Sequence, residues 1–137
     1  MSDQVKREVN IMTAVSILVI PADSAEAVRV ECIEPGLEPF QKLVGGYIEQ
    51  LPGRDAPGLN GDSWLAYVNE EGKLENLPVN ERATAFMHSV GGIYDWDTIN
   101  GAMIIIGEGD GEESDYADIP PQLLRFAGQS MDIGIPA

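Results

Sequence analysis

The sequence predicts an α+β fold, a small mixed, mostly antiparallel sheet covered by two or three short helices mainly on one face. Two apolar runs, 16–20 and 102–106, have the composition of central strands that are buried on both faces. Other segments show helical spacing or strand-like alternation, with turns rich in Gly and Pro between them. The length of 137 residues fits one domain, which we place at 12–137 after a polar, flexible leader at 1–11.

The first half of the domain is predicted to contain a hairpin and a short helix. Apolar and polar residues alternate in 28–33, as expected for a half-exposed antiparallel partner of the strand at 16–20. The stretch 40–44 has the apolar spacing of an amphipathic helix. Gly45 and Gly46 follow it and are expected to end that helix, because glycine adopts the backbone conformation of a helix C-terminus without strain.

Two further strands are predicted in the middle of the chain, at 47–51 and 64–68. The stretch between them, 52–62, is rich in Gly, Pro and Asp and should form a mobile surface loop. The polar residues 69–72 are then predicted to make a turn.

A second helix is predicted at 81–89, with Asn80 as its N-cap. The side-chain oxygen of an N-cap Asn accepts an otherwise unpaired N–H of the first helical turn. Gly91 and Gly92 end this helix, and a loop rich in aromatic residues and aspartate follows at 93–101.

The C-terminal part combines an acidic segment with a last helix. Residues 108–118 contain six carboxylates and no base, which opposes compact packing and predicts a mobile loop. Pro120 and Pro121 should begin the terminal helix, because proline is favoured in a first turn, and Gly128 should close it.

Charge and cysteine content narrow the classes of function. Eight basic and 23 acidic side chains give a formal net charge of -15, which disfavours direct binding to nucleic acid and favours basic partner surfaces. No apolar run approaches the roughly 20 residues that a helix needs to cross a bilayer. The N-terminus lacks the apolar core of a secretory signal, and Cys32 has no second cysteine to pair with. We therefore expect a cytoplasmic protein without membrane contact.

Three pieces of the sequence resemble a known family. They are QKLVGGYIE at 41–49, VNEEGKL followed by LPVNERAT within 68–84, and IIIG at 104–107, which leads into the acidic stretch. Their order is similar to that of domain of unknown function 3846, a family met in phages and mobile elements of bacteria. The resemblance begins near Met12 and implies a compact α+β domain located in the cytoplasm of a bacterial host. It implies no reaction and no catalytic residues, and the long loop at 52–62 departs from the family pattern.

The sequence offers little for catalysis or metal binding. A zinc site needs three or four ligands, mainly Cys and His, and the chain has one of each. Cys32 follows the apolar alternation of Val28 and Val30, which predicts a buried filler residue rather than a nucleophile paired with His88. The acidic stretch lacks the ligand spacing of a calcium-binding EF-hand. We expect no metal, no cofactor and no enzymatic activity.

His88 lies near the end of the helix predicted at 81–89, where a cation complements the helix dipole. A capping or partly exposed role is expected. A catalytic arrangement with Ser89 or Asp95 stays open as the alternative, since only geometry decides it.

The loop after the second helix carries the main binding candidates. Its two glycines and two large rings between carboxylates could form a lid that stacks on a planar ligand or fills a partner's pocket, or the rings could pack over the sheet. Glycine turns and an arginine are the groups available for a phosphate. The candidate ligand- or partner-binding residues are Tyr94, Trp96, Arg82, Gly91, Gly92, Gly45 and Gly46.

Three functions are compatible with these features. The first is a non-enzymatic phage accessory protein that binds and blocks a host bacterial protein with a basic surface, in host takeover or anti-defence. The second is a sponge that sequesters a nucleotide immune signal, in a pocket that is deep or lies at the interface of a homo-oligomer. The third is an acidic DNA mimic, whose carboxylates would stand in rows where phosphates stand in DNA.

Overall fold

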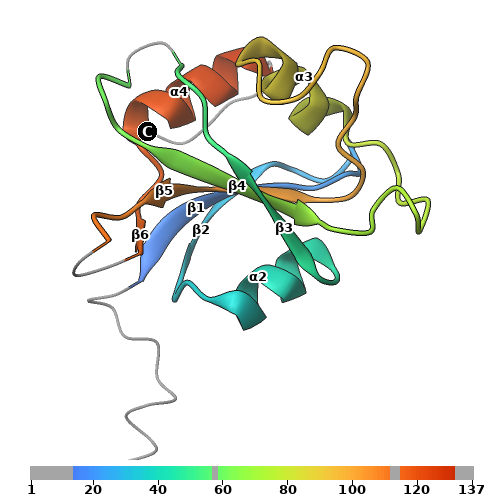
Figure 1. The fold of residues 1–137 in the computed structure, drawn as a ribbon, viewed down its shortest axis with the longest axis horizontal. Helices are drawn as coiled ribbons and strands as arrows, with labels where there is room; N and C mark the ends of the chain where they lie inside the picture. Colours follow the sequence, from blue (N-terminus) through green and yellow to red (C-terminus); the bar gives the residue numbers. More distant parts are fainter. Residues whose placement is uncertain (1–13, 57–58, 112–114, 132–137) are drawn as a thin grey trace, which may run out of the picture.

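The computed structural model describes residues 14–56, 59–111 and 115–131, and it shows one antiparallel sheet between helices (Figure 1). The elements are β1 (Val15–Ile20), β2 (Arg29–Ile33), α2 (Leu37–Val44), β3 (Ile48–Pro52), β4 (Trp64–Asn69), α3 (Glu81–Ser89), β5 (Met103–Glu108), β6 (Tyr116–Ala117) and α4 (Pro121–Ser130). The strand order is β2-β1-β5-β4-β3, and β6 also pairs with β5. Every described strand pair is antiparallel, so the predicted α+β fold is confirmed.

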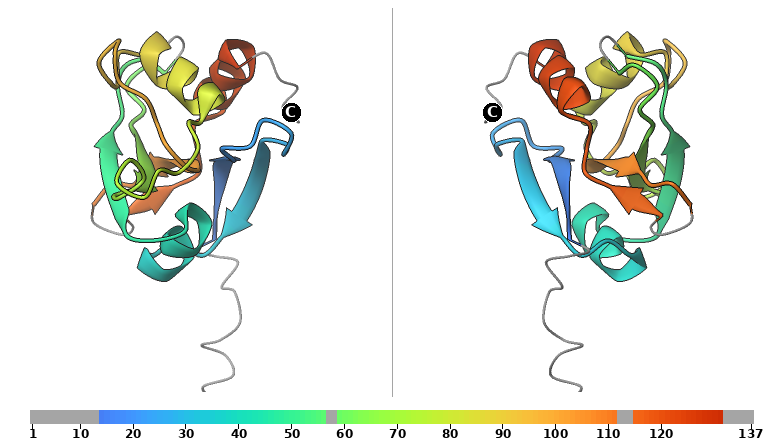
Figure 2. Two further views of the ribbon diagram at one scale, coloured as in Figure 1. Left: turned by 90° about the vertical axis from the view of Figure 1, so that its right-hand side faces the viewer. Right: turned by 90° about the vertical axis from the view of Figure 1, so that its left-hand side faces the viewer.

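The helices cover both faces of the sheet. α3 and α4 lie on one face, as expected, but α2 lies on the opposite face (Figures 1 and 2). The reason is that β1 and β5 are apolar on both sides, so each face needs a cover. Phe40 of α2 is fully buried against Tyr67 of β4, with the ring centroids 4.8 Å apart.

The two central strands were predicted correctly. Alternate residues of β1 point to opposite faces, so that Ile17 joins the core under α2 while Leu18 joins the core under α3 and α4. Ile104 and Ile105 of β5 divide between the two cores in the same way. The predicted hairpin is also present, since β2 pairs with β1 along its whole length.

Two ranges that were predicted to be mobile loops contain packed residues. Leu59, within 52–62, is buried in the core under α3. Tyr116, within 108–118, belongs to β6 and packs edge-on against Phe40, with the ring centroids 5.3 Å apart. In both cases one apolar side chain in a polar segment reaches a core and anchors the backbone.

The predicted helix ends are partly confirmed. Gly45 caps α2 in the left-handed conformation, with φ 81°, and α3 begins after Asn80 as expected. Gly128 does not end α4, which runs on to Ser130. Gly128 is a buried residue within the helix, which continues for two more residues.

The prediction that Cys32 is buried is wrong, because its side chain is exposed on β2. Val30 on the same strand is 38% exposed. β2 is the outermost strand on its side of the sheet. Apolar alternation therefore marks a strand face here, but the buried core on this face, under α3 and α4, contains no residue of β2.

The leader predicted at 1–11 lies outside the described residues. Within the described part of the chain, every helix is too short or too polar to cross a bilayer.

Asn80 joins three parts of the fold through a fully buried side chain. Its Oδ1 accepts a hydrogen bond from the Ala83 N–H at 3.0 Å, which caps α3. Its Nδ2 donates to the carbonyl oxygens of Ile20 at 2.9 Å and Gly101 at 3.0 Å. One amide thus fixes the start of α3 against the end of β1 and the residues before β5.

We predict that Asn80→Ala lowers the free energy of unfolding by roughly 3 kcal/mol, because a helix cap is lost and two buried carbonyls lose their donor. Asn80→Asp should also be strongly destabilising, since it keeps the cap but turns a carboxylate toward both carbonyls. Urea denaturation measures both. Gln129→Ala, at an exposed amide of α4, is the control and should change stability by less than about 0.5 kcal/mol. A small loss for both Asn80 variants would contradict the assigned role.

Candidate functional site

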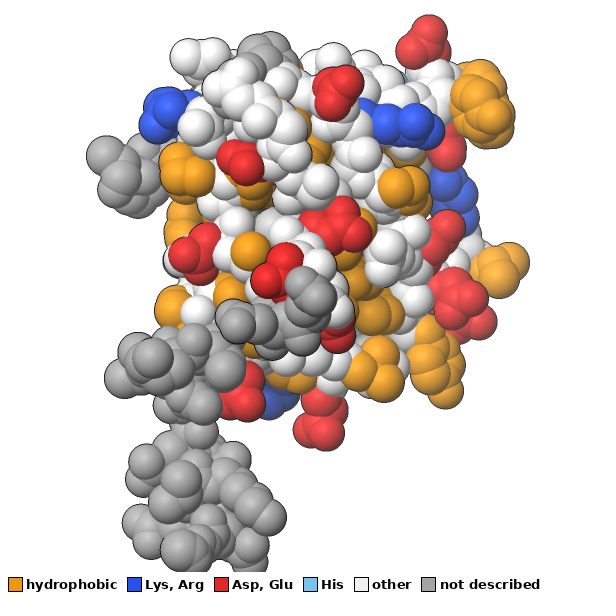
Figure 3. All heavy atoms as spheres, turned by 60° about the vertical axis from the view of Figure 1, so that its left-hand side comes forward, with side chains coloured by type: hydrophobic (Ala, Val, Ile, Leu, Met, Phe, Trp, Pro, Cys, Tyr) orange, Lys and Arg blue, Asp and Glu red, His pale blue; other side chains and the backbone are white. Residues whose placement is uncertain are grey.

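Several large apolar side chains are exposed on the surface of the protein, between Asp and Glu side chains. On the face shown in Figure 3, carboxylates are scattered singly, with apolar groups between them and few basic groups. The exposed large hydrophobic residues of the described chain are Val30, Leu37, Tyr47, Leu74, Val79, Tyr94 and Trp96. Tyr94 and Trp96 are 72% and 79% exposed, and they come from one loop.

The two rings of this loop stack on each other. The centroids of Tyr94 and Trp96 are 5.4 Å apart and the planes differ by 6°. Their high exposure shows that the rings do not finish the core, which was one reading of the sequence. The pair therefore presents a flat, preorganised aromatic surface to solvent.

Asp97 anchors the aromatic loop next to the rings. Its Oδ1 accepts a charge-assisted hydrogen bond from Lys73 Nζ at 2.7 Å and a hydrogen bond from the Thr98 N–H at 2.8 Å. Its backbone oxygen lies 2.9 Å from Nε2 of His88, in the last turn of α3. Lys73 is the main reason that the pKa of Asp97 lies below its ordinary value. These contacts tie the loop to α3 and to the turn after β4.

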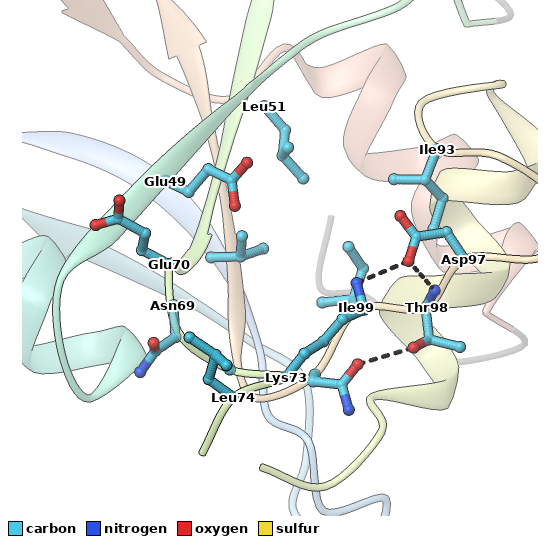
Figure 4. Close-up of a pocket in the computed structure, with 13 residues that line it drawn as sticks. Glu49, Leu51, Asn69, Glu70, Lys73, Leu74, Ile93, Asp97, Thr98 and Ile99 are labelled. Carbon is cyan, nitrogen blue, oxygen red and sulfur yellow. Dashed lines mark hydrogen bonds and ion pairs between the residues drawn. The ribbon is translucent and has the colours of Figure 1, made fainter. Parts of the chain in front are cut away.

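A groove lies between β3 and this loop (Figure 4). We call it the β3 groove, and its volume is about 220 Å³. Glu49 and Leu51 point into it from β3, and Ile93 and Asp97 face them from the loop. Val68, Ile99 and Leu74 contribute apolar surface, while Glu70 and Lys73 add charge. The groove therefore combines apolar and polar lining residues, with the Glu49 carboxylate on the β3 side.

Two further hollows continue the β3 groove. One, of about 330 Å³, is lined by Gly91, Gly92, Tyr94 and Arg54 and shares Leu51 with the groove. The other, of about 230 Å³, is lined by Gly46 and Tyr47, among others, and shares Asn69. Four of the exposed hydrophobic residues, Tyr47, Leu74, Tyr94 and Trp96, lie on or next to this band. Exposed apolar residues that gather around neighbouring hollows in this way are typical of binding sites.

Comparison with known families matches residues 15–130 to the family described as Domain of unknown function (DUF3846). The chain belongs to this family. The match extends from β1 to the last residue of α4, so it includes every element of the sheet and both helical layers. The resemblance noted in the sequence is thereby confirmed.

The remaining comparisons concern the fold. A search of curated proteins found no match. A solved structure described as a small RNA methyltransferase, HEN1, is similar with a TM-score of 0.56 and 17% identity. The similarity covers 88% of this chain and 17% of the methyltransferase chain. At this identity the likeness shows a shared fold for the DUF3846 domain and says nothing of activity.

The structure brings together some of the binding residues predicted for this DUF3846 domain. Gly91, Gly92 and Tyr94 line one hollow, and Trp96 stacks on Tyr94. Gly46 lines the hollow at the other end of the band.

The other two predicted residues have structural roles. Gly45 caps α2, and its N–H donates to Gln41. Arg82 donates from one guanidinium nitrogen to the carbonyl oxygens of Pro21 and Asp23, at 3.0 and 2.9 Å. Arg82 therefore fixes the residues after β1, and it lines neither the groove nor the hollow beside Tyr94.

The residues of the band that sequence reasoning missed include Glu49, Arg54, Lys73 and Leu74. Leu74 gave one signal, because a large apolar residue in a polar turn is unusual, and it is 83% exposed. Glu49, Arg54 and Lys73 resemble any other charged surface residue in the sequence. Only the pairing of β3 with β4 and the return of the 93–101 loop bring them together.

The nucleophile pairings considered in the sequence are not formed. Cys32 lies on β2, at one edge of the sheet, whereas His88 bonds to the loop beside β3, at the other edge. The hydroxyl of Ser89 donates to the Phe86 carbonyl and also contacts Ser130. Among the described residues, no group of three His, Cys, Asp or Glu side chains is arranged to hold a metal ion.

We predict that Asp97→Asn destabilises the protein by about 0.2–1 kcal/mol at pH 7, the range for a partly exposed ion pair. The pKa of Asp97 is lower in the folded state than its ordinary value of 3.8, so its charged form stabilises the fold. This contribution is complete above the unfolded pKa and is lost as the pH falls through the folded pKa. Thermal unfolding at several pH values from 7 downward should show the two proteins converging below about pH 4.

Asp95→Asn, next to the ion pair in sequence and exposed, removes the same charge and is the control. A stability difference between wild type and Asp97→Asn that is constant with pH would contradict the ion pair as its source.

Proposed function

We propose that this domain is a non-enzymatic binding protein that occupies and blocks a protein of the bacterial cell, as an accessory protein of a phage or mobile element. The observation that carries the proposal is the exposed, stacked pair of Tyr94 and Trp96 beside the β3 groove. Large rings held out of the core in a fixed geometry are the usual anchors of protein interfaces.

The stacked geometry of this pair favours protein recognition. Rings that are already ordered lose little conformational freedom when a partner covers them. The anchoring contacts of Asp97 with Lys73 and His88 hold the loop in the free protein. Burying both rings removes a large apolar area from water, which can supply several kcal/mol of binding energy.

The net charge of -15 supports a partner with a basic surface. Long-range attraction speeds the encounter of oppositely charged proteins, and the aromatic contacts then slow dissociation. Charge alone does not specify a partner, since the carboxylates on the face in Figure 3 are dispersed. In this proposal acidity guides the approach and the aromatic loop provides the specific contact.

We predict that Trp96→Ala weakens capture of the cellular partner by about 2 kcal/mol or more, roughly 30-fold, because an interface anchor is removed. Tagged wild type and variant would be used to capture proteins from bacterial lysate, with quantification by mass spectrometry. Stability should change little, since Trp96 is 79% exposed.

Leu37→Ala is the matched control, because Leu37 is 62% exposed but belongs to α2, on the opposite face of the sheet. Capture should survive this change. If wild type retains no specific protein, or if Trp96→Ala retains the same proteins in the same amounts, the proposal fails.

A nucleotide sponge is the second candidate, favoured by the hollow of about 330 Å³ that Gly91, Gly92, Tyr94 and Arg54 line. In this hollow Arg54, rather than Arg82, is the cation placed to meet a phosphate. The surrounding acids oppose an anionic ligand. A nucleotide that raises the melting temperature of wild type but not of Arg54→Ala would favour the sponge over protein binding.

The DNA-mimic hypothesis gains no support from the visible surface. Mimicry needs carboxylates in rows at phosphate-like spacing, and on the face in Figure 3 they stand apart among other side chains.

A further inference from the structure

We infer that the partner docks on β3 as an added β-strand, and that this strand is an extended basic segment with a basic and a large apolar residue two positions apart. The inference rests on the proposed function and specifies its binding mode and partner chemistry. It depends on three features of β3: a free backbone edge, a groove with carboxylates beside it, and an apolar end next to the aromatic pair.

β3 is the outermost strand on its side of the sheet, with only β4 as a neighbour. The N–H of Glu70 donates to the carbonyl oxygen of Tyr47 at 2.8 Å, so residue 47 forms a hydrogen-bonded pair. Alternation in an antiparallel ladder then directs the backbone groups of Glu49 and Leu51 toward β4. The N–H and C=O groups of Ile48 and Gln50 point outward, where an added strand would meet them.

The length of this edge suits a short peptide. β3 has five residues, which at the usual rise corresponds to about 16 Å. Its one proline, Pro52, is at the end of the strand, so the N–H groups of Ile48 and Gln50 remain available as donors. An edge with two outward residues offers four hydrogen bonds, and side-chain contacts must provide the remaining affinity and the specificity.

Side chains of the β3 groove set the chemistry of the added strand. Glu49 and Leu51 lie on the same face of β3, two residues apart, and both point into the groove. A strand alongside would place its own residues at the same spacing next to them. A Lys or Arg of the partner beside Glu49 would also lie near Glu70. The one basic side chain of the groove, Lys73, is already paired with Asp97, so it does not neutralise Glu49.

At the Leu51 end of the groove, an apolar residue of the partner strand is favoured. Leu51 lines both the groove and the hollow that contains Tyr94, so it joins the two sites. A large apolar side chain there would cover Leu51 and Ile93 and would reach the exposed aromatic pair. The basic residue of the partner therefore lies beside Glu49 and its large apolar residue beside Leu51. Because Glu49 and Leu51 are two residues apart, the two partner residues are also two positions apart.

Charge argues against a second copy of this chain as the occupant. Two β3 strands paired edge to edge would bring Glu49 of each copy near the other, between molecules that each carry -15. Charged residues on an edge strand are a common protection against such pairing. A basic partner segment would instead be attracted to Glu49 and to the negative net charge of the chain.

The test is a selection from a random-sequence peptide display library on the folded protein, followed by synthesis of the enriched peptides. We expect Lys or Arg two positions from a large apolar residue, and slower hydrogen exchange of the Ile48 and Gln50 amides on binding. Glu49→Lys should weaken binding at least about tenfold, while Glu26→Lys, with the same charge change away from β3, should not.

Backbone pairing is tested separately from side-chain contacts. Gln50→Pro removes an outward N–H and should abolish binding, while Gln50→Ala keeps that N–H and should bind as wild type does. Because Gln50→Pro also loses the bond to Tyr67, its fold must be checked by thermal unfolding. A peptide methylated on its backbone nitrogens tests the same hydrogen bonds on unchanged protein and should not bind.

Several results would overturn the inference. They are the absence of enriched peptides, enrichment of acidic peptides, unchanged amide exchange at Ile48 and Gln50, or a dimer of the free protein with these amides protected. Failure here is distinguishable from failure of the proposed function. Loss of cellular capture in Trp96→Ala without any enriched peptide refutes only strand addition, whereas peptide binding without cellular capture refutes only the cellular role.

Discussion

The buried amide of Asn80 is the junction on which the candidate site depends. It binds the end of β1, the residues before β5 and the first turn of α3 at once. These bonds fix where α3 begins, and its last turn carries His88, which contacts the backbone of Asp97. The position of the aromatic loop is therefore set from a point inside the core. Such an arrangement holds exposed rings in place without burying them, which an anchor for a partner requires.

Prediction from sequence succeeded where local rules decide the outcome. A β-branched run buried on both faces, an Asn before a helix and a Gly after one each specify their structure through a few neighbouring residues, as at Asn80 and Gly45. Cys32 was misjudged because alternation reports a strand face and not whether a helix reaches it. The edge position of β2 depends on the order of all the strands, which no short stretch encodes.

The site was only partly predictable for the same reason. Tyr94, Trp96, Gly91 and Gly92 are adjacent in the sequence and were recognised as one loop. Their partners come from elsewhere: Lys73 reaches Asp97 from the turn after β4, and Glu49 faces the loop from β3. Arg82 illustrates the opposite error. It was assigned to a ligand, but two backbone carbonyls in the turn after β1 already bind its guanidinium.

The two edges of the sheet are protected differently, and this difference makes β3 the better docking edge. On β2 the side chains of Arg29 and Glu31 pair with each other, so that edge presents little unbalanced charge. On β3 the carboxylate of Glu49 faces a groove of mixed polar and apolar lining, in which the one cation, Lys73, is already paired with Asp97. An edge strand with unpaired charges of one sign repels other copies of itself and attracts segments of opposite charge. The acidity of the chain thus has a local consequence at β3 that a uniform solvating charge would not have.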